Sequence, residues 1–520
     1  MTNTTITPQE IIAEAEGLAK APIQIKDTGF VLRNLLKGIE PVNFHSHAFD
    51  SYDKLAEKRA KLEKATTNPD GSVKQSATAE REELKEITQR LESFKLFQKH
   101  YLIIVIEQLL KIAKENSWSL CQRQGFYYIF NGIHWQVIEE AELKAFLGKV
   151  AEKMGVPKFD SRHYEFKDKL FKQFEASAHL PEPKINDDTV LVNFPNGTAE
   201  ITSNGLKLRE HREADFLTYV LSFEYDPKAT APRFKKFLDE VLPDKKSQQV
   251  LAEFMGYIFT RNLKLEKILF LFGSGRNGKS VMFEIIRAML GENNMSFFSL
   301  TSLTDDAGYH RAKLLNKQIN WASDIGDKLQ SNTFKQLASG EPIECRLPYK
   351  EPFLLQNICK FAFNTNTLPT DVEHTSAFFE RFLIVPFDVY IEPEKRDPKL
   401  AEKIIKTELP GIFNWVLDGL NMLLEQEKFS PCPASDKVLA DFKKESDSVA
   451  LFLDETGYQP DPNARIQAKT VYNQYREYCF DEGLRPLARK NFTKRMESLG
   501  CFSKKENIGK VFYIHRNGQQ

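Results

Sequence analysis

The sequence has no excess charge of either sign and little cysteine. Its 520 residues contain 72 Lys+Arg and 72 Asp+Glu, so the formal net charge is zero. A uniformly basic nucleic-acid binder is therefore excluded, and a polyanionic partner would have to be held by local patches. The six cysteines form no C-x-x-C pair, and no partnering Cys or His cluster follows His45 and His47. We therefore expect reduced, structural thiols and no zinc site.

Long hydrophobic runs are also missing. The most apolar stretch, 101–113, is interrupted by Glu107, Gln108 and Lys111, and it is too short and too polar to cross a bilayer. The N-terminus shows no basic start followed by an apolar run, so no signal peptide is visible. With 41% apolar and 28% charged residues, the composition is that of a soluble globular protein of about three or four domains. We expect a protein of the (host cell) cytoplasm with no membrane partner.

Periodicity and turn signals divide the chain into five predicted regions. Helical spacing of apolar residues dominates 54–65 and 79–113, whereas 125–135 and 191–201 are β-prone around turns. The predicted regions are a helical N-terminal region (1–115), a small mixed α/β region (116–205), a helical collar segment (206–262), an α/β domain (263–428) and a C-terminal domain (436–520).

The most specific motif is a glycine-rich loop, GSGRNGKS. It follows the apolar run 267–272 and precedes the helix-like run 281–290, which is the context that a phosphate-binding loop requires. Its glycines let backbone N–H groups point at phosphates, and the helix N-terminus favours negative charge. Lys279 would reach the β- and γ-phosphates, and Ser280 would help hold Mg²⁺. We predict an ATPase that uses Mg²⁺, with nucleotide contacts from Gly273, Ser274, Gly275, Arg276, Asn277, Gly278, Lys279 and Ser280.

Two later β-prone runs end in polar residues. One ends in Asp324, whose carboxylate can bind Mg²⁺ through water or orient the attacking water, with Asp327 as the alternative. The other ends in Asn366, which could orient the lytic water or sense the γ-phosphate; Asn364 competes for this role. A helix cap or an Asn-rich turn would be the purely structural interpretation of these residues.

Arg381 stands just before a third β-prone run, 382–387. An arginine in this position could cross a subunit boundary as a finger that stabilises transition-state charge. A surface ion pair is the alternative.

In this order, the motifs resemble the superfamily 3 helicases. More closely, they resemble the phage/plasmid-type and poxvirus-type primase–helicases. The resemblance extends more weakly upstream through 126–135, 191–197 and 208–229. It implies a multidomain α/β chain whose AAA+-like ATPase domain has a central parallel sheet. The segments that carry it are GSGRNGKS (273–280), NWASD (320–324), FKQLASGEPIECRLPYKEPF (334–353), FNTNTLP (363–369) and AFFERFLIVPF (377–387).

By position, the resemblance makes Lys279 and Ser280 the nucleotide and Mg²⁺ residues and Asp324 the acidic residue at the strand end. Asn366 becomes the sensor and Arg381 the arginine finger. The family usually has Glu where this chain has Asp324, and this departure bears on its role as the catalytic base. The resemblance further implies a homo-oligomeric ring, a hexamer, that translocates 3′ to 5′ on single-stranded DNA.

The segment 339–353 would form a hairpin that lines the pore of the ring. Lys350 lies near its tip and Arg346 beside it. A lysine on a mobile hairpin can follow a phosphate backbone without reading sequence.

Relatives often carry a primase domain, which needs clustered acidic metal ligands on adjacent strands. Here Asp50, Asp53 and the pair Asp187–Asp188 are the only hints. We therefore expect no primase activity in this chain and, as a possible partner, a separate primase or polymerase.

The C-terminal end is locally basic. From residue 486 onwards, eight Lys/Arg stand against two Glu, and two helix-like segments precede β-prone ones. This order is typical of a winged helix, and the charge is a footprint for a polyanion. We predict contacts with duplex or origin DNA; a solvated basic face or a protein-contact module is the alternative. The candidates are Arg489, Lys490 and Lys494 on a recognition helix and Lys504 and Lys505 in the wing.

Three functions fit these motifs to different degrees. The leading one is an ATP-dependent replicative DNA helicase of a phage, plasmid or other mobile element. The second is an origin-binding initiator or loader in which ATP acts as an assembly switch. A DNA-packaging motor ranks last, because it predicts neither the basic C-terminal domain nor an arginine acting in trans.

Overall fold

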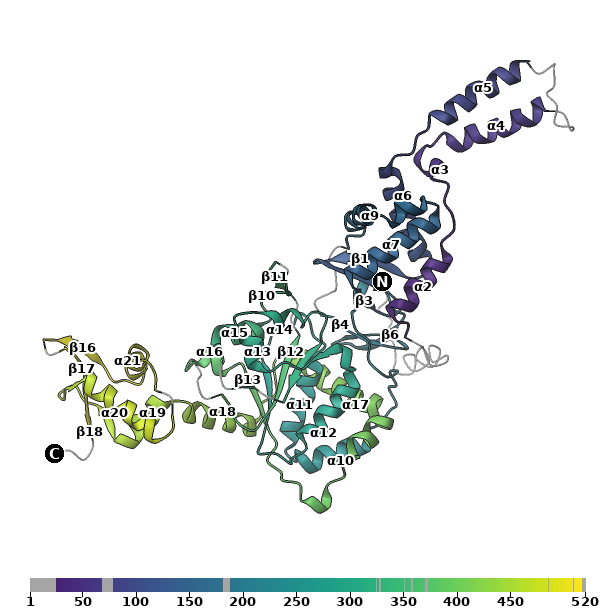
Figure 1. The fold of residues 1–520 in the computed structure, drawn as a ribbon. Coiled ribbons are helices and arrows are strands. Elements are labelled where there is room, and N and C mark those ends of the chain that lie inside the picture. The colour runs from purple at the N-terminus through teal and green to yellow at the C-terminus, as the bar shows by residue number, and fades with distance from the viewer. Residues whose placement is uncertain are drawn as a thin grey trace. The chain divides into compact units, whose positions relative to one another are not determined.

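The structure is a computed structural model that describes residues 25–67, 78–180, 188–323, 325–326, 329–349, 351–356, 359–369, 373–484, 486–507 and 509–516 (Figure 1). It forms two compact units. The first comprises the described parts of 19–186 and 209–220, and the second those of 187–208 and 221–520. The predicted mixed region 116–205 is thus divided between the two units. No helix in the described ranges is long and apolar enough to cross a membrane.

The first unit is a helical domain with a small antiparallel sheet. Its larger core joins helices from 28–115 to the strands and helices of 119–177, with Val31, Leu109, Ile129 and Leu147 fully buried. The predicted hairpin at 125–135 is present, because Phe130 pairs with Trp135. The elements are α2 (Thr28–Gly38), α3 (Phe44–Ala48), α4 (Tyr52–Thr66), α5 (Thr78–Ser93), α6 (Gln98–Glu115), β1 (Ser119–Arg123), β2 (Phe126–Phe130), β3 (Trp135–Ile138), α7 (Glu140–Met154), α8 (Lys158–Arg162), α9 (Tyr164–Ser177) and the 3₁₀ turn η1 (Glu213–Asp215).

The helix expected over 79–113 is interrupted. The backbone N–H of Phe97 donates to Nδ1 of His100 at 3.1 Å, so α5 and α6 are separate helices.

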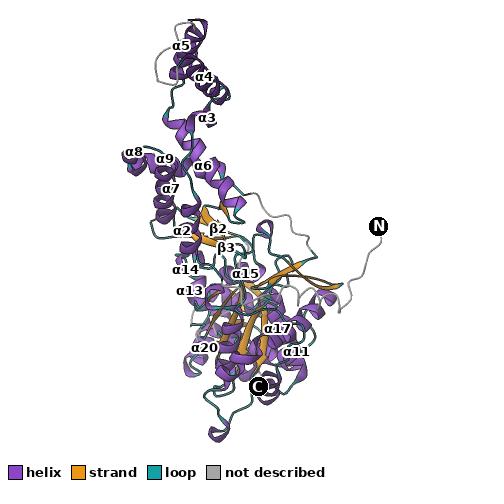
Figure 2. Cartoon of the chain, turned by 90° about the vertical axis from the view of Figure 1, so that its right-hand side faces the viewer, coloured by secondary structure: helices purple, strands orange, loops and turns teal. Residues whose placement is uncertain are grey.

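The second unit is built around a five-stranded parallel sheet with the order β13-β7-β12-β9-β8, which Figure 2 shows between helices. One face carries Ile268, Phe270 and Phe363 in a core closed by residues such as Phe334 and Phe378. The strands are β7 (Ile268–Phe272), β8 (Met295–Ser296), β9 (Ile319–Ala322), β12 (Lys360–Thr365) and β13 (Phe382–Pro386); the helices are α12 (Lys279–Leu290), η2 (Glu292–Asn294), α13 (Leu300–Thr304), α14 (Tyr309–Ala312), α15 (Ser331–Ser339), α16 (Ser376–Phe379) and η3 (Pro393–Lys395).

The segment before the sheet packs on the long helix that follows it. Gly419 of α17 (Leu400–Gln426) approaches α11 (Lys245–Tyr257) so closely that an added Cβ would lie 2.3 Å from the backbone of Ala252. Phe194 of the preceding sheet packs against Phe413 with ring centroids 4.8 Å apart. The remaining elements here are α10 (Pro232–Val241), β4 (Val190–Phe194), β5 (Gly197–Thr202), β6 (Gly205–Arg209) and the hairpin β10 (Ile343–Cys345) and β11 (Phe353–Leu355).

The C-terminal residues have a core of their own, centred on Phe452, Tyr475 and Phe492. As predicted, two helices precede an antiparallel strand pair, β16 and β17, with β15 on the other side of β17. The elements are α18 (Pro433–Glu445), α19 (Ser448–Thr456), β14 (Tyr458–Pro460), β15 (Ile466–Gln467), α20 (Ala468–Asp481), α21 (Arg489–Ser498), β16 (Ser503–Glu506), β17 (Gly509–Phe512) and β18 (Ile514–Arg516).

Candidate nucleotide and nucleic-acid sites

The glycine-rich loop connects the buried central strand β7 to α12, as its motif requires. Three residues with positive φ curl its backbone: φ is +102° at Gly275, +55° at Arg276 and +90° at Gly278. α12 then begins at Lys279, so its unpaired N–H groups face the loop. A helix N-terminus behind a curled glycine-rich loop is a binding site for phosphate.

A buried hydrogen-bond bridge holds this loop in shape. Lys279 Nζ donates to Gly273 O at 2.6 Å and to Asn277 Oδ1 at 3.1 Å. Asn277 Nδ2 donates to Phe387 O, just after β13, at 2.6 Å. A Cβ on Gly273 would lie 2.3 Å from the same Phe387 oxygen, so this position requires glycine. Burial also lowers the pKa of Lys279 from its ordinary value.

A cavity of about 1030 Å³ opens over the loop. Its polar wall comes from the loop and from the carboxyl ends of β9 and β12, and its other wall includes apolar side chains such as Phe237, Val241 and Ile391. A concave site that combines apolar side chains with convergent polar groups is the usual form of a small-molecule site. The size and the phosphate loop together fit a nucleoside triphosphate.

The predicted sensor residues both line this cavity. Asn364 is buried, and its Oδ1 accepts a hydrogen bond from Trp321 Nε1 at 3.0 Å, which gives it a structural role. Asn366 is exposed at the end of β12, which pairs directly with β7. Of the two, Asn366 therefore has the side chain that is accessible to a ligand.

The acidic candidates Asp324 and Asp327 lie outside the described residues, so their roles stay predictions. Their neighbours Ser323 and Ile325 line the nucleotide cavity at the end of β9. Ser280, in the first turn of α12, is exposed and lines it too. A hydroxyl oxygen beside phosphate oxygens suits a hard cation such as Mg²⁺, so the residues present fit the predicted ion.

Arg381 lies at the opposite edge of the sheet. It directly precedes β13, and its carbonyl accepts the N–H of Ile268, the first residue of β7. The phosphate loop follows the other end of β7, and five strand residues span about 16 Å. Arg381 is therefore one strand length away from its own chain's phosphate loop.

In this single chain, the Arg381 side chain is held by an ion pair, which was the alternative prediction for it. Arg381 Nη2 donates to Glu266 Oε2 at 2.7 Å, and Nη1 donates to the carbonyl of Ala377. Its Nε is buried and has no hydrogen-bond partner in the part of the chain that the structure describes. The guanidinium thus retains an unused donor.

A second cavity, of about 1000 Å³, lies at the same edge as Arg381. Arg261, Lys264, Lys267 and Lys360 contribute to its wall. Burial lowers the pKa of Lys267 and brings that of Lys360 to about 8. Asp188 and Glu427 also line this cavity, so four basic residues stand against two acidic ones, and the excess positive charge favours an anionic ligand.

The predicted pore segment contains an antiparallel hairpin in which Cys345 of β10 pairs with Phe353 of β11. Arg346, immediately after β10, is exposed. Tyr349 is also fully exposed, and its φ of +60° is uncommon for a bulky residue. Lys350 lies outside the described residues, so its position at the tip stays a prediction.

The five C-terminal candidates are all exposed. Other basic residues of this region are engaged: Arg495 pairs with Asp447 at 2.5 Å, and Lys510 with Glu497 at 3.2 Å. None of the candidates forms an ion pair within the described ranges. They lie in the first two turns of α21 and on β16: Arg489, Lys490, Lys494, Lys504 and Lys505.

Sequence reasoning missed three residues. The first is Glu266, whose ion pair with Arg381 joins positions 115 residues apart, so no local sequence pattern predicts it. The same is true of Arg311, whose buried side chain binds distant carbonyls. Tyr349 could have been found, because an exposed aromatic beside a lysine in a predicted DNA-contacting hairpin is a candidate for base stacking.

Comparison with known proteins places these features in a family. Residues 95–243 match the family model "D5 N terminal like", and 271–381 match a family of unknown function, DUF5906. "Putative helicase L207/L206" of Acanthamoeba polyphaga mimivirus is 22% identical over 276 residues, or 51% of this chain and 28% of that protein. "Putative helicase 121R" of Invertebrate iridescent virus 3 is 23% identical over 324 residues, 53% of this chain and 33% of that protein.

These matches support a phage- and virus-type primase–helicase family. "Putative helicase 022R" of Frog virus 3 (isolate Goorha) is a further relative of this kind, 22% identical over 50% of this chain and 29% of its own length. The chain thus matches about a third or less of the length of these curated relatives. Among solved structures, the apo C-terminal region of NrS-1 aligns over 78% of this chain and 98% of its own, with a TM-score of 0.44 and 13% identity.

Proposed function

We propose that this member of the primase–helicase family is an ATP-dependent DNA helicase of superfamily 3, with an AAA+-like ATPase domain. The observation that carries the proposal is the arrangement of one sheet. A phosphate loop and a nucleotide-sized cavity lie at its carboxyl edge, and Arg381 with a basic cavity lies at its amino edge. One chain therefore presents half of an ATPase site on each of two edges.

Two such edges complete a site when subunits associate head to tail. A heterologous contact of this kind closes into a ring, for which the family resemblance implies six subunits. Arg381 then leaves its ion pair with Glu266 and binds the γ-phosphate held by the neighbouring subunit. The Nε of Arg381, which has no partner among the described residues, supplies a further donor. The surrounding Lys264 and Lys267 make that edge electrostatically suited to a triphosphate.

In the chemical step, Lys279 leaves its carbonyl partner and donates to the phosphates, while Asn366 and Asp324 orient the attacking water. Ser280 would help to hold the Mg²⁺ that accompanies ATP, and this ion would supply positive charge against the phosphates. Arg381 of the adjacent subunit stabilises the charge that develops in the transition state; such fingers increase kcat by about 10³–10⁵.

The hairpin β10–β11 contacts single-stranded DNA in the pore. Arg346 and Lys350 bind phosphates, and Tyr349 stacks on a base, a contact that is worth about 1–3 kcal/mol and tolerates any sequence. We propose 3′ to 5′ movement. The helicase acts in the cytoplasm of a host cell during replication of a phage, plasmid or other mobile element. A separate primase supplies the primers.

The C-terminal residues form a winged helix that binds duplex or origin DNA. Arg489 and Lys490 lie in the first turn of α21, where the helix dipole disfavours positive charge by about 0.3–1 kcal/mol each. Basic side chains at this helix end are thus explained better by a polyanionic partner than by stability. The same observation favours the second candidate function, an origin-binding initiator or loader with little processive unwinding.

The test is ATP hydrolysis with and without single-stranded DNA, together with strand displacement on tailed duplexes. We expect DNA-stimulated hydrolysis and displacement that requires a 3′ tail, both lost in Lys279→Ala. Lys350→Ala should abolish displacement and leave ATP binding intact. Origin melting that survives Lys350→Ala would favour the initiator, and absence of DNA stimulation in the wild type would contradict the helicase.

A further inference from the structure

A short segment at the end of β9 forms one wall of the nucleotide cavity. Ser323, Ile325 and Gly326 line it. The backbone N–H and Oγ1 of Thr301 both donate to the carbonyl of Ile325, at 3.2 and 3.0 Å. A Cβ on Gly326 would lie 2.1 Å from Thr301 Oγ1, so these two segments are in the closest possible contact. Displacement of this wall by a bound nucleotide therefore displaces the start of α13.

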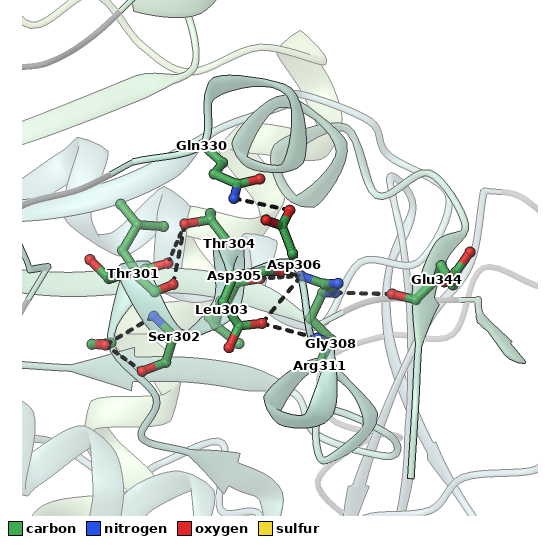
Figure 3. A network of polar contacts seen from close by, with 12 residues as sticks. Thr301, Ser302, Leu303, Thr304, Asp305, Asp306, Gly308, Arg311, Gln330 and Glu344 are labelled. Carbon is green, nitrogen blue, oxygen red and sulfur yellow. Dashed lines mark hydrogen bonds and ion pairs between the residues drawn. The ribbon is translucent and has the colours of Figure 1, made fainter. Parts of the chain in front are cut away.

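The other end of α13 is bound to Arg311 (Figure 3). Arg311 Nη1 donates to the carbonyls of Leu303 at 3.0 Å and Asp305 at 2.6 Å. Its Nε donates to the carbonyl of Glu344, in strand β10 of the hairpin, at 3.0 Å. One side chain, only 8% exposed, thus joins the segment after α13 to the hairpin.

The chemistry of this contact makes it stiff. The nearest carboxylate oxygen, on Asp305, is 3.9 Å from Nη1 and already accepts the N–H of Gly308, so Arg311 depends on the three carbonyls. A buried cation that loses such a partner is left with an unsatisfied donor away from water, which is strongly unfavourable. The guanidinium is planar and its donors are fixed in direction, so the two sides that it binds move together.

We infer that Arg311 is a positioning residue. It transmits nucleotide-dependent displacement from Ser323, Ile325 and Gly326 of the cavity wall, through Thr301 and α13, to the hairpin strands β10 and β11. This inference rests on the proposed function, because it explains how ATP binding would move the hairpin that contacts DNA. The path is contiguous, and each step is a hydrogen bond between named groups. Arg311 touches neither nucleotide nor DNA in this path.

The test follows the hairpin directly by fluorescence. Leu354 of β11 is 63% exposed, whereas all six native cysteines are buried, so a thiol-reactive fluorophore on a Leu354→Cys background reports on the hairpin. The probe ligand is the Mg²⁺ complex of β,γ-imido-ATP, added to the full chain. The matched control is Arg287→Lys, in which a half-buried arginine paired with Glu292 is changed in the same way.

We expect the nucleotide to change the fluorescence of the labelled Leu354→Cys variant, and also of the labelled variant that carries both Leu354→Cys and Arg287→Lys. Most of that change should be lost with Arg311→Lys or Thr301→Val, while nucleotide affinity and ATP turnover without DNA stay within about twofold. A full change with both Arg311→Lys and Thr301→Val would overturn the inference, as would no change in the background itself. DNA-stimulated hydrolysis and strand displacement, measured on the unlabelled wild type, decide separately whether the proposed function holds.

Discussion

Replacement of Asn277 by alanine tests how the phosphate loop is held. Asn277 is 3% exposed, and its amide is the link between the loop, Lys279 and the residue after β13. Asn277→Ala leaves the buried carbonyl of Phe387 without this donor, which costs about 1–3 kcal/mol of the free energy of unfolding. For a unit of this size, the melting temperature should fall by roughly 2–4 °C for each kcal/mol.

The same change should weaken ATP binding. Without the bridge the loop samples conformations that do not bind phosphate, and a cost of about 1.4 kcal/mol to restore its shape lowers affinity about tenfold. Thermal melting and calorimetric titration with ATP measure the two effects. Ser274→Ala is the control, because Ser274 is exposed in the same loop. Wild-type melting and wild-type ATP affinity in Asn277→Ala would refute this account of the loop.

Three further predictions concern charge. Burial lowers the pKa of Lys279, and a bound triphosphate would raise it again, so ATP binding should be accompanied by proton uptake as the pH rises through the lowered pKa. Calorimetry in buffers of different ionisation enthalpy measures this uptake. If no proton is taken up, the assignment of Lys279 to phosphate is contradicted. The pKa of Lys360 is about 8 in the folded chain and higher in the unfolded chain, so the free energy of unfolding should rise between about pH 8 and 10. Urea unfolding at each pH should show this rise in the wild type and a smaller one in Lys360→Met. An equal dependence on pH in both would argue against a desolvated Lys360. Arg489→Gln with Lys490→Gln should weaken duplex binding uniformly across sequences and reduce the salt slope by about two. The melting temperature should not fall, because both charges oppose the dipole of α21. An unchanged slope would point to a protein-contact surface.

Local signals predicted the elements that surround the nucleotide. β7 is a run of apolar residues ended by Gly273, and α12 starts where the glycines stop, so strand, loop and helix could be placed from sequence alone. The hairpin at 126–138 followed from aromatic strands around an Asn-Gly turn.

Long-range contacts could not be predicted in this way. The strand order of the sheet depends on pairings such as that of β13 with β7, which are more than 100 residues apart in the sequence. The Asn277–Phe387 hydrogen bond and the Glu266–Arg381 ion pair also join residues more than 100 positions apart. The difference in burial between Asn364 and Asn366 could not be predicted either, because Asn364 is held by a hydrogen bond from Trp321 on a neighbouring strand.

Mixing of two inactive variants tests the central claim most directly, because the claim is that Arg381 serves the nucleotide of a neighbouring subunit. Lys279→Ala and Arg381→Ala should each lack DNA-stimulated ATP turnover. In an equal, random mixture, about one quarter of interfaces combine an intact loop with an intact finger. The account predicts recovery of ATP turnover toward about that fraction of wild type. Full turnover by Arg381→Ala alone, or no recovery on mixing subunits that do assemble, would contradict it.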